Sequence, residues 1–121
     1  MFCKEKNVEK PKVKVTPSQE EQPYLCRFCR APVARVEHWV RIDGLLDHVF
    51  ANPHGHVFEI RCFSNAEGCV AVSFPSLEFT WFKGYEWQVG ECAQCHGHLG
   101  WYYRRKDTSF WGLILDNLIQ P

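Results

Sequence analysis

The fold of this chain is decided by the stretch "FTWFKGYEWQVGECAQCHGHLGWYYRR", residues 79–105, which combines three tryptophans with the pair Cys92-Ala-Gln-Cys95. A matching pair, Cys26-Arg-Phe-Cys29, lies much earlier in the chain. A two-residue spacer lets both thiolates of a tight turn face one ion, and two such turns give a closed tetrahedral sulfur site. We therefore predict one structural Zn²⁺ held by the four cysteines, which ties distant parts of the chain together.

Other uses of these cysteines fit the sequence less well. A redox Cys-X-X-Cys of the thioredoxin type begins a helix after a strand, and neither pair is followed by a helical pattern. A catalytic zinc needs an open coordination position, which four cysteines do not leave. We expect His96 and His98 to lie beside the site or at the surface. Cys62 and Cys69 are expected to be buried free thiols, with a disulfide between them as the alternative in an oxidising compartment.

The overall composition indicates a single neutral domain. The chain has 121 residues, of which 45% are hydrophobic, and this is enough for one modest core. Its formal net charge is zero, which disfavours binding to nucleic acid or to an anionic membrane. No apolar run is long enough to span a bilayer, and no secretory signal is visible, so we expect a cytoplasmic protein. In that reducing compartment, seven cysteines favour metal binding or burial.

The pattern along the chain predicts a flexible N-terminal tail over residues 1–22 and a zinc-binding β domain over residues 23–121. The tail is rich in Lys, Glu, Pro and Gln, whereas the remainder shows short apolar or alternating runs divided by Gly, Pro and Asn. We expect a mainly β fold without helices. Residues 43–56 are expected to form a long loop. Strands are predicted over residues 32–42, 57–63, 69–74, 78–82, 85–89, 100–104 and 109–115, with 57–63 and 69–74 paired as a hairpin.

Trp81, Trp87 and Trp101 fall on three of these predicted strands. Large aromatic side chains in small domains usually fill the core, but three indoles brought together could also form the walls of a cavity. If Trp81 and Trp87 face the same cavity from a hairpin, side-chain alternation requires a three-residue connection, residues 83–85, or a bulge. The residues alone leave the core and the cavity as alternatives.

The order of several short motifs resembles that of one known family. "NPHG" (52–55), "WFKGYEW" (81–87), "CAQCHGHLGW" (92–101) and "FWGL" (110–113) follow one another between and after the cysteine pairs. This order is similar to that of the CULT domain, the thalidomide-binding domain of cereblon, over about residues 22–119. The resemblance implies a β-tent, in which two antiparallel sheets meet at an angle and are pinned by one zinc at four cysteines.

The same resemblance implies a site that binds cyclic imides between three indoles. In the family, backbone groups around the first tryptophan bond the ring carbonyl and N–H, and one aromatic residue and one loop asparagine complete the site. The implied ligands are glutarimide, thalidomide-type compounds, cyclised C-terminal residues and uracil-like rings. Carried over to this chain, the ligand-binding residues are Asn52, Phe79, Trp81, Trp87, Trp101 and Tyr103.

This sequence departs from the family pattern at two site positions and in its extent. Phe79 stands where cereblon has a histidine, and Tyr103 replaces a phenylalanine, which adds a hydroxyl at the edge of the site. The chain has no room for the second domain through which cereblon joins a ubiquitin ligase. We therefore expect a free-standing member that does not assemble a ligase by itself.

Two other functions remain open at the level of sequence. An aromatic cage can also hold an alkylammonium group by cation–π attraction, and acidic residues in the cage would favour this ligand. A methionine sulfoxide reductase shares the zinc-pinned sheet architecture, but it needs a reactive cysteine in the cavity, where Cys62 or Cys69 would have to lie. No nucleophile beside a base is visible, so we predict a binding module and not an enzyme.

Overall fold

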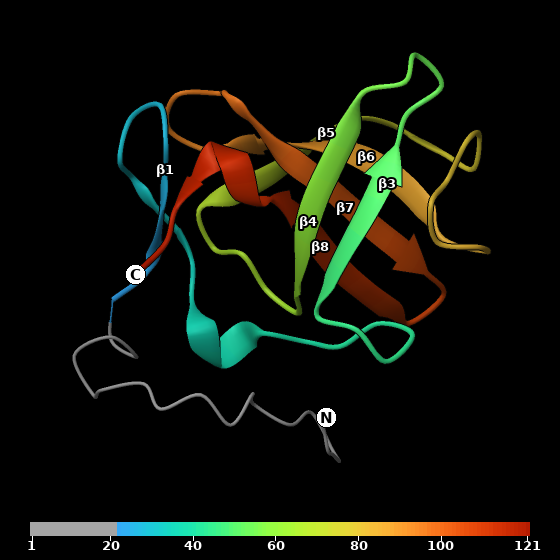
Figure 1. Cartoon of the computed structure of the whole chain (residues 1–121), viewed down its shortest axis with the longest axis horizontal. Coiled ribbons are helices and arrows are strands. Elements are labelled where there is room, and N and C mark those ends of the chain that lie inside the picture. The colour runs from blue at the N-terminus through green and yellow to red at the C-terminus, as the bar shows by residue number, and fades with distance from the viewer. Residues whose placement is uncertain (1–21) are drawn as a thin grey trace.

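The computed structural model describes residues 22–121 (Figure 1). The predicted tail, residues 1–22, lies almost wholly outside this part of the chain, as does Cys3, so the domain boundary at residue 23 stays a prediction. The elements are β1 (Tyr24–Cys26), β2 (Pro32–Ala34), the 3₁₀ helix η1 (Val36–His38), β3 (Asp47–Ala51), β4 (Val57–Phe63), β5 (Cys69–Ser76), β6 (Glu86–Cys92), β7 (His98–Arg105), β8 (Thr108–Ile114), the 3₁₀ helix η2 (Leu115–Asn117) and β9 (Leu118–Ile119).

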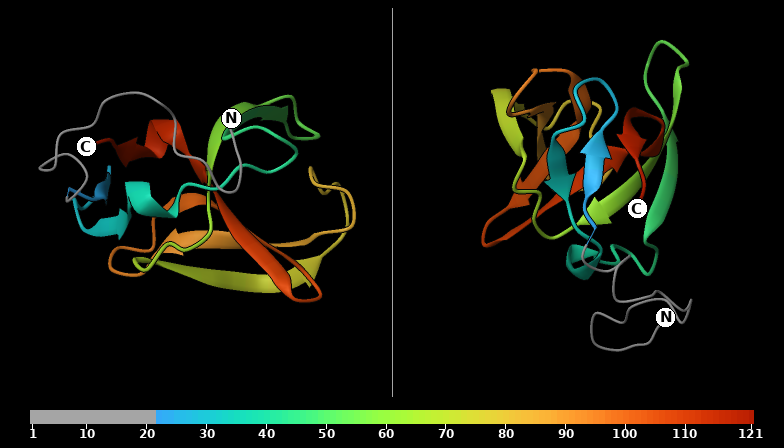
Figure 2. Two further views of the ribbon diagram at one scale, coloured as in Figure 1. Left: turned by 90° about the horizontal axis from the view of Figure 1, so that it is seen from below. Right: turned by 90° about the vertical axis from the view of Figure 1, so that its left-hand side faces the viewer.

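The strands form two antiparallel sheets, which confirms the predicted fold class. The small sheet has the order β2-β1-β9, and the large sheet has the order β3-β4-β8-β7-β6-β5. In the left view of Figure 2, β3 and β4 lie on one side of the molecule and β5 and β6 on the other, joined through β8 and β7. The large sheet is therefore strongly bent and open at one end. Among the described residues, no helix is long and apolar enough to cross a membrane.

Two buried clusters fill the fold. The first lies between the small sheet and the large sheet and includes Tyr24, Phe63 and Trp111. The second lies within the bend of the large sheet and includes Phe82, Tyr103 and Phe110, against which all three predicted site tryptophans pack. β7 and β8 approach closely at Gly100, where an added Cβ would lie 2.1 Å from the Gly112 carbonyl oxygen. Glycine is required there because any side chain would push the two strands apart.

Polar side chains join the small sheet to the large one. Arg61 on β4 donates through Nε and Nη2 to the Asp47 carboxylate at 2.7 and 2.8 Å, and through Nη1 to the Tyr24 hydroxyl at 2.9 Å. Trp39 Nε1 donates to the same hydroxyl at 3.0 Å, and the Arg61 guanidinium lies over the Trp39 ring. Burial alone would lower the Arg61 pKa, but Asp47 and the Tyr24 hydroxyl together outweigh it, so the pKa is raised and the charge is kept.

The predicted pairing of 57–63 with 69–74 is wrong. Both segments are strands, β4 and β5, but β4 pairs with β3 and β8 whereas β5 pairs with β6 at the far edge. The predicted loop over 43–56 is also partly wrong, because it contains β3, whose residues pair with β4 from Asp47↔Arg61 to Ala51↔Val57. Residues 32–42 form only β2, η1 and two isolated bridges, from Trp39 to Phe63 and from Ile42 to Leu45. The local sequence pattern identified several of these strands, but their pairing depends on contacts between residues far apart in the chain.

The segment predicted as a strand over 78–82 is instead part of the β5–β6 connection. A turn is closed by the bond from the Thr80 N–H to the Leu77 carbonyl, and a second by the bond from the Tyr85 N–H to the Phe82 carbonyl. The second turn has two central residues, so the predicted three-residue connection is wrong. Its premise fails because Trp81 lies outside any strand, and strand alternation does not decide where its side chain points.

Candidate functional site: a four-cysteine cluster and an aromatic cavity

The two Cys-X-X-Cys segments form matching turns. In the first, the Arg30 N–H donates to the Cys26 carbonyl at 2.8 Å and the Cys26 N–H donates to the Ala31 carbonyl at 2.8 Å. In the second, the His96 N–H bonds the Cys92 carbonyl and the Cys92 N–H bonds the Gly97 carbonyl, each at 2.9 Å. Arg30 and His96 both have positive φ, 69° and 65°. The chain therefore uses one backbone geometry twice to aim two pairs of thiols.

The four sulfurs come together in a geometry that suits zinc. Sγ of Cys26 lies 3.7 Å from Sγ of Cys95, and Sγ of Cys29 lies 3.6 Å from Sγ of Cys92. All four sulfurs lie within 4.8 Å of one another. A tetrahedron of sulfurs around zinc, with bonds of about 2.3 Å, has edges of about 3.8 Å. The distances fit that polyhedron and are far longer than a disulfide bond.

Backbone N–H groups donate to the sulfurs of the cluster and favour a thiolate at Cys92. The N–H groups of Phe28, Gln94 and Gly97 point at cysteine sulfurs, each at 3.4 Å. Burial opposes ionisation of Cys92, but the backbone donors at Cys95 and Gln94 and the bonds with the Cys29 and Cys95 thiols together outweigh it and lower the pKa of that thiol to about 7. At Cys29 a backbone donor lowers the pKa, but burial and the neighbouring thiols outweigh it and raise the pKa to about 12. Such a site can hold one divalent ion with full sulfur coordination, which leaves no open position for catalysis. When bound, zinc would supply cross-linking between the small sheet and the β6–β7 turn.

The two remaining described cysteines are buried free thiols, as predicted. Cys62 lies in the second cluster, and Cys69 lies opposite Cys92 in the β5–β6 ladder. Burial raises the pKa of both thiols, that of Cys69 to about 12. They lie on β4 and β5, which do not pair with each other, and both are free thiols, so the alternative disulfide is not formed.

An aromatic cavity of about 520 Å³ opens at the bend of the large sheet. Its walls come from the β3–β4 loop, the β5–β6 connection and the facing sides of β6 and β7. The lining residues are Asn52, Pro53, His54, Phe79, Trp81, Trp87, Val89, Trp101 and Tyr103. All six residues predicted as ligand-binding therefore line one cavity; their binding role stays a prediction.

The three indoles are fixed by their neighbours. Trp81 and Trp101 meet edge to face, with ring centroids 4.7 Å apart, and Trp81 also stacks on Phe50 at 5.0 Å. Phe58 packs edge to face against Trp101 at 5.2 Å. Trp87 enters from β6, opposite Tyr103 in the β6–β7 ladder. The rings form a rigid half-buried wall, so a ligand can contact them without first ordering side chains.

Two of the three indole N–H groups, those of Trp81 and Trp87, are already engaged by the protein. Trp81 Nε1 donates to the Ala51 carbonyl at 3.2 Å, and Trp87 Nε1 donates to the Glu78 carbonyl at 2.7 Å. In contrast, no protein partner within residues 22–121 is recorded for the Trp81 backbone N–H or the Phe79 carbonyl. The cavity wall therefore presents these two main-chain polar groups beside the ring surfaces of the indoles.

Asn52 and Tyr103 line the cavity in ways the sequence did not specify. The Asn52 side-chain oxygen accepts from the N–H groups of His54 and His56 at 3.0 and 2.9 Å, which closes the tight β3–β4 loop. That oxygen is thus committed to the loop. Tyr103 is only 2% exposed and packs against Phe82 and Phe110, so it belongs to the inner wall and not the edge. This burial raises the Tyr103 pKa, and its hydroxyl stays protonated.

Several residues that line or support the aromatic cavity were not predicted from the sequence. Val89 lines the cavity two residues after Trp87 on β6, so strand alternation could have found it. Pro53 and His54 follow Asn52 within the quoted "NPHG" motif. Phe50 and Phe58 pair across β3 and β4 and support the indoles from behind. No local signal reveals that support, because β3 itself was not recognised.

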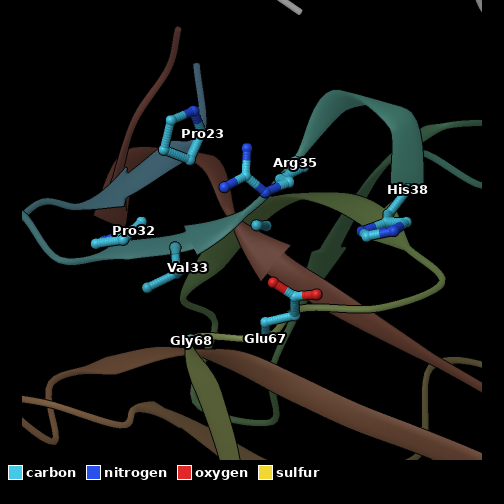
Figure 3. A pocket seen from close by; sticks show the side chains of 8 residues that line it. Pro23, Pro32, Val33, Arg35, His38, Glu67 and Gly68 are labelled. Atoms are coloured by element: carbon cyan, nitrogen blue, oxygen red, sulfur yellow. The ribbon is translucent and has the colours of Figure 1, made fainter. Parts of the chain in front are cut away.

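A second, smaller cavity of about 250 Å³ lies beside the small sheet (Figure 3). Pro23, Pro32 and Val33 form its apolar side, and the side chains of Arg35, His38 and Glu67 form its polar side. It contains none of the three site tryptophans. The aromatic cavity is larger and combines several ring surfaces with main-chain polar groups, which is the usual composition of a small-molecule site.

The fold and the two sites define a small β domain with a four-cysteine cluster that could hold one metal ion and an aromatic cavity. Comparison with known proteins shows that the sequence of this chain is similar to part of the cereblons. Protein cereblon of Xenopus tropicalis is 41% identical over 77 residues, 60% of this chain and 17% of that protein. The cereblons of Danio rerio and Drosophila yakuba are 36% and 30% identical over 58% and 71% of this chain, respectively.

These similarities indicate a cereblon-like domain. The matched regions make up 17% of the Danio rerio protein and 15% of the Drosophila yakuba protein. The chain thus spans about a sixth of the length of these relatives. No protein-family model matches the chain.

Proposed function

We propose that this chain is a binding module that holds cyclic imides, such as glutarimide, thalidomide-type compounds or cyclised C-terminal residues, against Trp81, Trp87 and Trp101. The observation that carries the proposal is the cavity itself. Three indoles offer ring surfaces there, while the Phe79 carbonyl and the Trp81 N–H lie nearby and form no hydrogen bond within residues 22–121. An imide ring has flat faces, one N–H donor and carbonyl acceptors, so it matches both features.

The charge of the cavity favours an imide over the alternative alkylammonium ligand. A cation–π cage gains from acidic residues that offset the cost of desolvating the cation. The lining residues include no aspartate or glutamate. A neutral, weakly polar ring is therefore the better match, and uracil-like rings share its hydrogen-bonding edge.

The enzyme alternative has little support at this site. A methionine sulfoxide reductase needs a reactive thiolate at the substrate, but Cys62 and Cys69 are buried, have raised pKa values and do not line the cavity. We also propose that one structural Zn²⁺ occupies the four-cysteine cluster. The cytoplasmic location and the lack of nucleic-acid binding remain predictions.

Calorimetric titration tests the proposal, with glutarimide, uracil and tetramethylammonium as separate probes. Glutarimide should bind most tightly and quench tryptophan emission, and Trp81→Ala should abolish both signals. Trp111→Phe serves as the matched control, because Trp111 packs in the first cluster, away from the cavity. The proposal fails if glutarimide gives no heat and no quenching at millimolar concentration, or if tetramethylammonium binds more tightly.

A further inference from the structure

Phe79 occupies an unusual position in the cavity wall. Its φ is 58°, a left-handed conformation that is uncommon for a bulky residue, and its side chain is 67% exposed. It is the third residue of the turn closed by the Thr80 N–H and the Leu77 carbonyl. Positive φ at that turn position favours glycine or asparagine. The phenylalanine therefore occupies a turn position that favours smaller residues, and it exposes an apolar ring to solvent.

The surrounding contacts hold this conformation in place. The Glu78 N–H donates to Ser76 Oγ at 3.0 Å, and the Glu78 carbonyl accepts the bond from Trp87 Nε1 at 2.7 Å. Thr80 Oγ1 donates to the Tyr85 carbonyl at 2.8 Å. Residues held in sparsely populated conformations by surrounding contacts cluster at ligand sites. The turn therefore fixes an aromatic ring at the cavity wall while its own carbonyl remains available to a ligand.

The size of the cavity leaves room for more than a ring. Cavities of 300–1,000 Å³ typically take drug-sized ligands, and this one measures about 520 Å³. A single imide ring placed against the indoles would leave much of the space unfilled. Because Phe79 is the most exposed aromatic residue of the lining, it is suited to contact whatever group is attached to the ring.

We propose that Phe79 is a specificity-determining residue, which packs against an apolar side chain of the residue that precedes a cyclised C-terminal residue. This inference rests on the proposed function and narrows its ligand class to peptide ends in which an aromatic or large aliphatic residue comes before the imide. Aromatic contacts of this kind are worth enough to change affinity about 3- to 10-fold.

The test compares two synthetic peptides that end in the same cyclic imide, one with phenylalanine and one with alanine before it. By calorimetry, the unchanged protein should bind the phenylalanine peptide about 3- to 10-fold more tightly. Phe79→Asn, which retains a residue suited to positive φ, should bring this ratio close to one. Any loss of affinity that is common to both peptides cancels in the ratio of their affinities. Phe74→Asn is the control, because Phe74 is 93% exposed but does not line the cavity.

The outcomes separate this inference from the function on which it rests. If the unchanged protein binds glutarimide but does not distinguish the peptides, only the role of Phe79 is overturned. The same holds if Phe79→Asn keeps the full ratio, or if Phe74→Asn loses it. If glutarimide itself does not bind, the proposed function fails and the inference fails with it. The peptide comparison on the unchanged protein can overturn the inference even if Phe79→Asn does not fold.

Discussion

The four-cysteine cluster and the aromatic cavity are assembled in different ways. Each half of the cluster is a short turn whose own backbone bonds aim the sulfurs, so the fold has only to bring two finished halves together. The cavity, in contrast, contains no segment whose own backbone bonds fix the position of its side chains. Trp81 lies in a connection, Trp87 and Trp101 lie on neighbouring strands, and Asn52 comes from a loop at the other side of the bend.

Because of this difference, we expect the cluster to affect the stability of the domain and the cavity to affect ligand binding. The cluster joins segments more than sixty residues apart, since Cys26 contacts Cys95 across 69 positions and Cys29 contacts Cys92 across 63. Loss of one ligand should therefore affect the whole domain. The indoles are only half-buried and lie at the open end of the large sheet, so a change there should act mainly on a ligand. The following predictions test that separation.

The largest effect is expected from loss of a metal ligand. Cys92→Ser should lower the free energy of unfolding by more than about 4 kcal/mol, because it removes both a zinc ligand and the link between the sheets. Circular dichroism melts, with zinc measured colorimetrically after release, provide the readout. We expect one zinc per unchanged chain and cooperative unfolding that chelators abolish.

Cys69→Ala is the matched control for that experiment. Cys69 lies opposite Cys92 on the neighbouring strand but is outside the four-sulfur cluster. The control should keep its zinc and lose only about 1 kcal/mol. A Cys92→Ser protein that melts together with the control would show that the cluster does not hold the fold together.

An intermediate effect is expected at Trp87. Trp87→Leu should weaken glutarimide binding at least about tenfold, equivalent to 1.4 kcal/mol, because one wall of the cavity is lost. Its stability should fall by only about 1 kcal/mol, since the side chain is half-buried. Paired calorimetric titrations and thermal melts measure both quantities.

Trp39→Phe provides the comparison for Trp87→Leu, because Trp39 bonds Tyr24 at the joint between the sheets and does not line the cavity. It should lower stability without a change in ligand affinity. The separation of the two regions would be contradicted if Trp87→Leu destabilised the domain as much as Cys92→Ser.

The smallest effect is expected at Arg30, the left-handed residue of the first cysteine turn. Arg30→Gly should raise the free energy of unfolding by up to about 1 kcal/mol, because glycine adopts positive φ without steric cost. Arg30→Val should lower it by at least about 1 kcal/mol, because a β-branched residue is poorly accommodated there. Urea unfolding of both proteins resolves these shifts. Equal shifts would mean that the turn relaxes and does not constrain the sulfurs.

The sequence predicted some elements well because their signals are local. Residues 57–63 match β4, and the alternation within residues 85–89 and 100–104 identified parts of β6 and β7. The segment around Trp81 was mistaken for a strand because its aromatic residues have high β-propensity, although two turns shape it. β3 was missed because Asp47 and His48 give it a polar start, and its pairing with β4 decides its structure.

The sequence by itself determined the chemistry of the four-cysteine cluster. Cys-X-X-Cys specifies a turn through nearest neighbours, and two such pairs specify four sulfurs for one ion, whatever path the chain takes between them. Only the tertiary structure decided how the aromatic residues are used. The bend of the large sheet places β3 and β4 opposite β6 and β7, and it turns Trp81, Trp87 and Trp101 from possible core residues into the walls of a cavity. That arrangement depends on which strands pair, and pairing is a property of the whole chain.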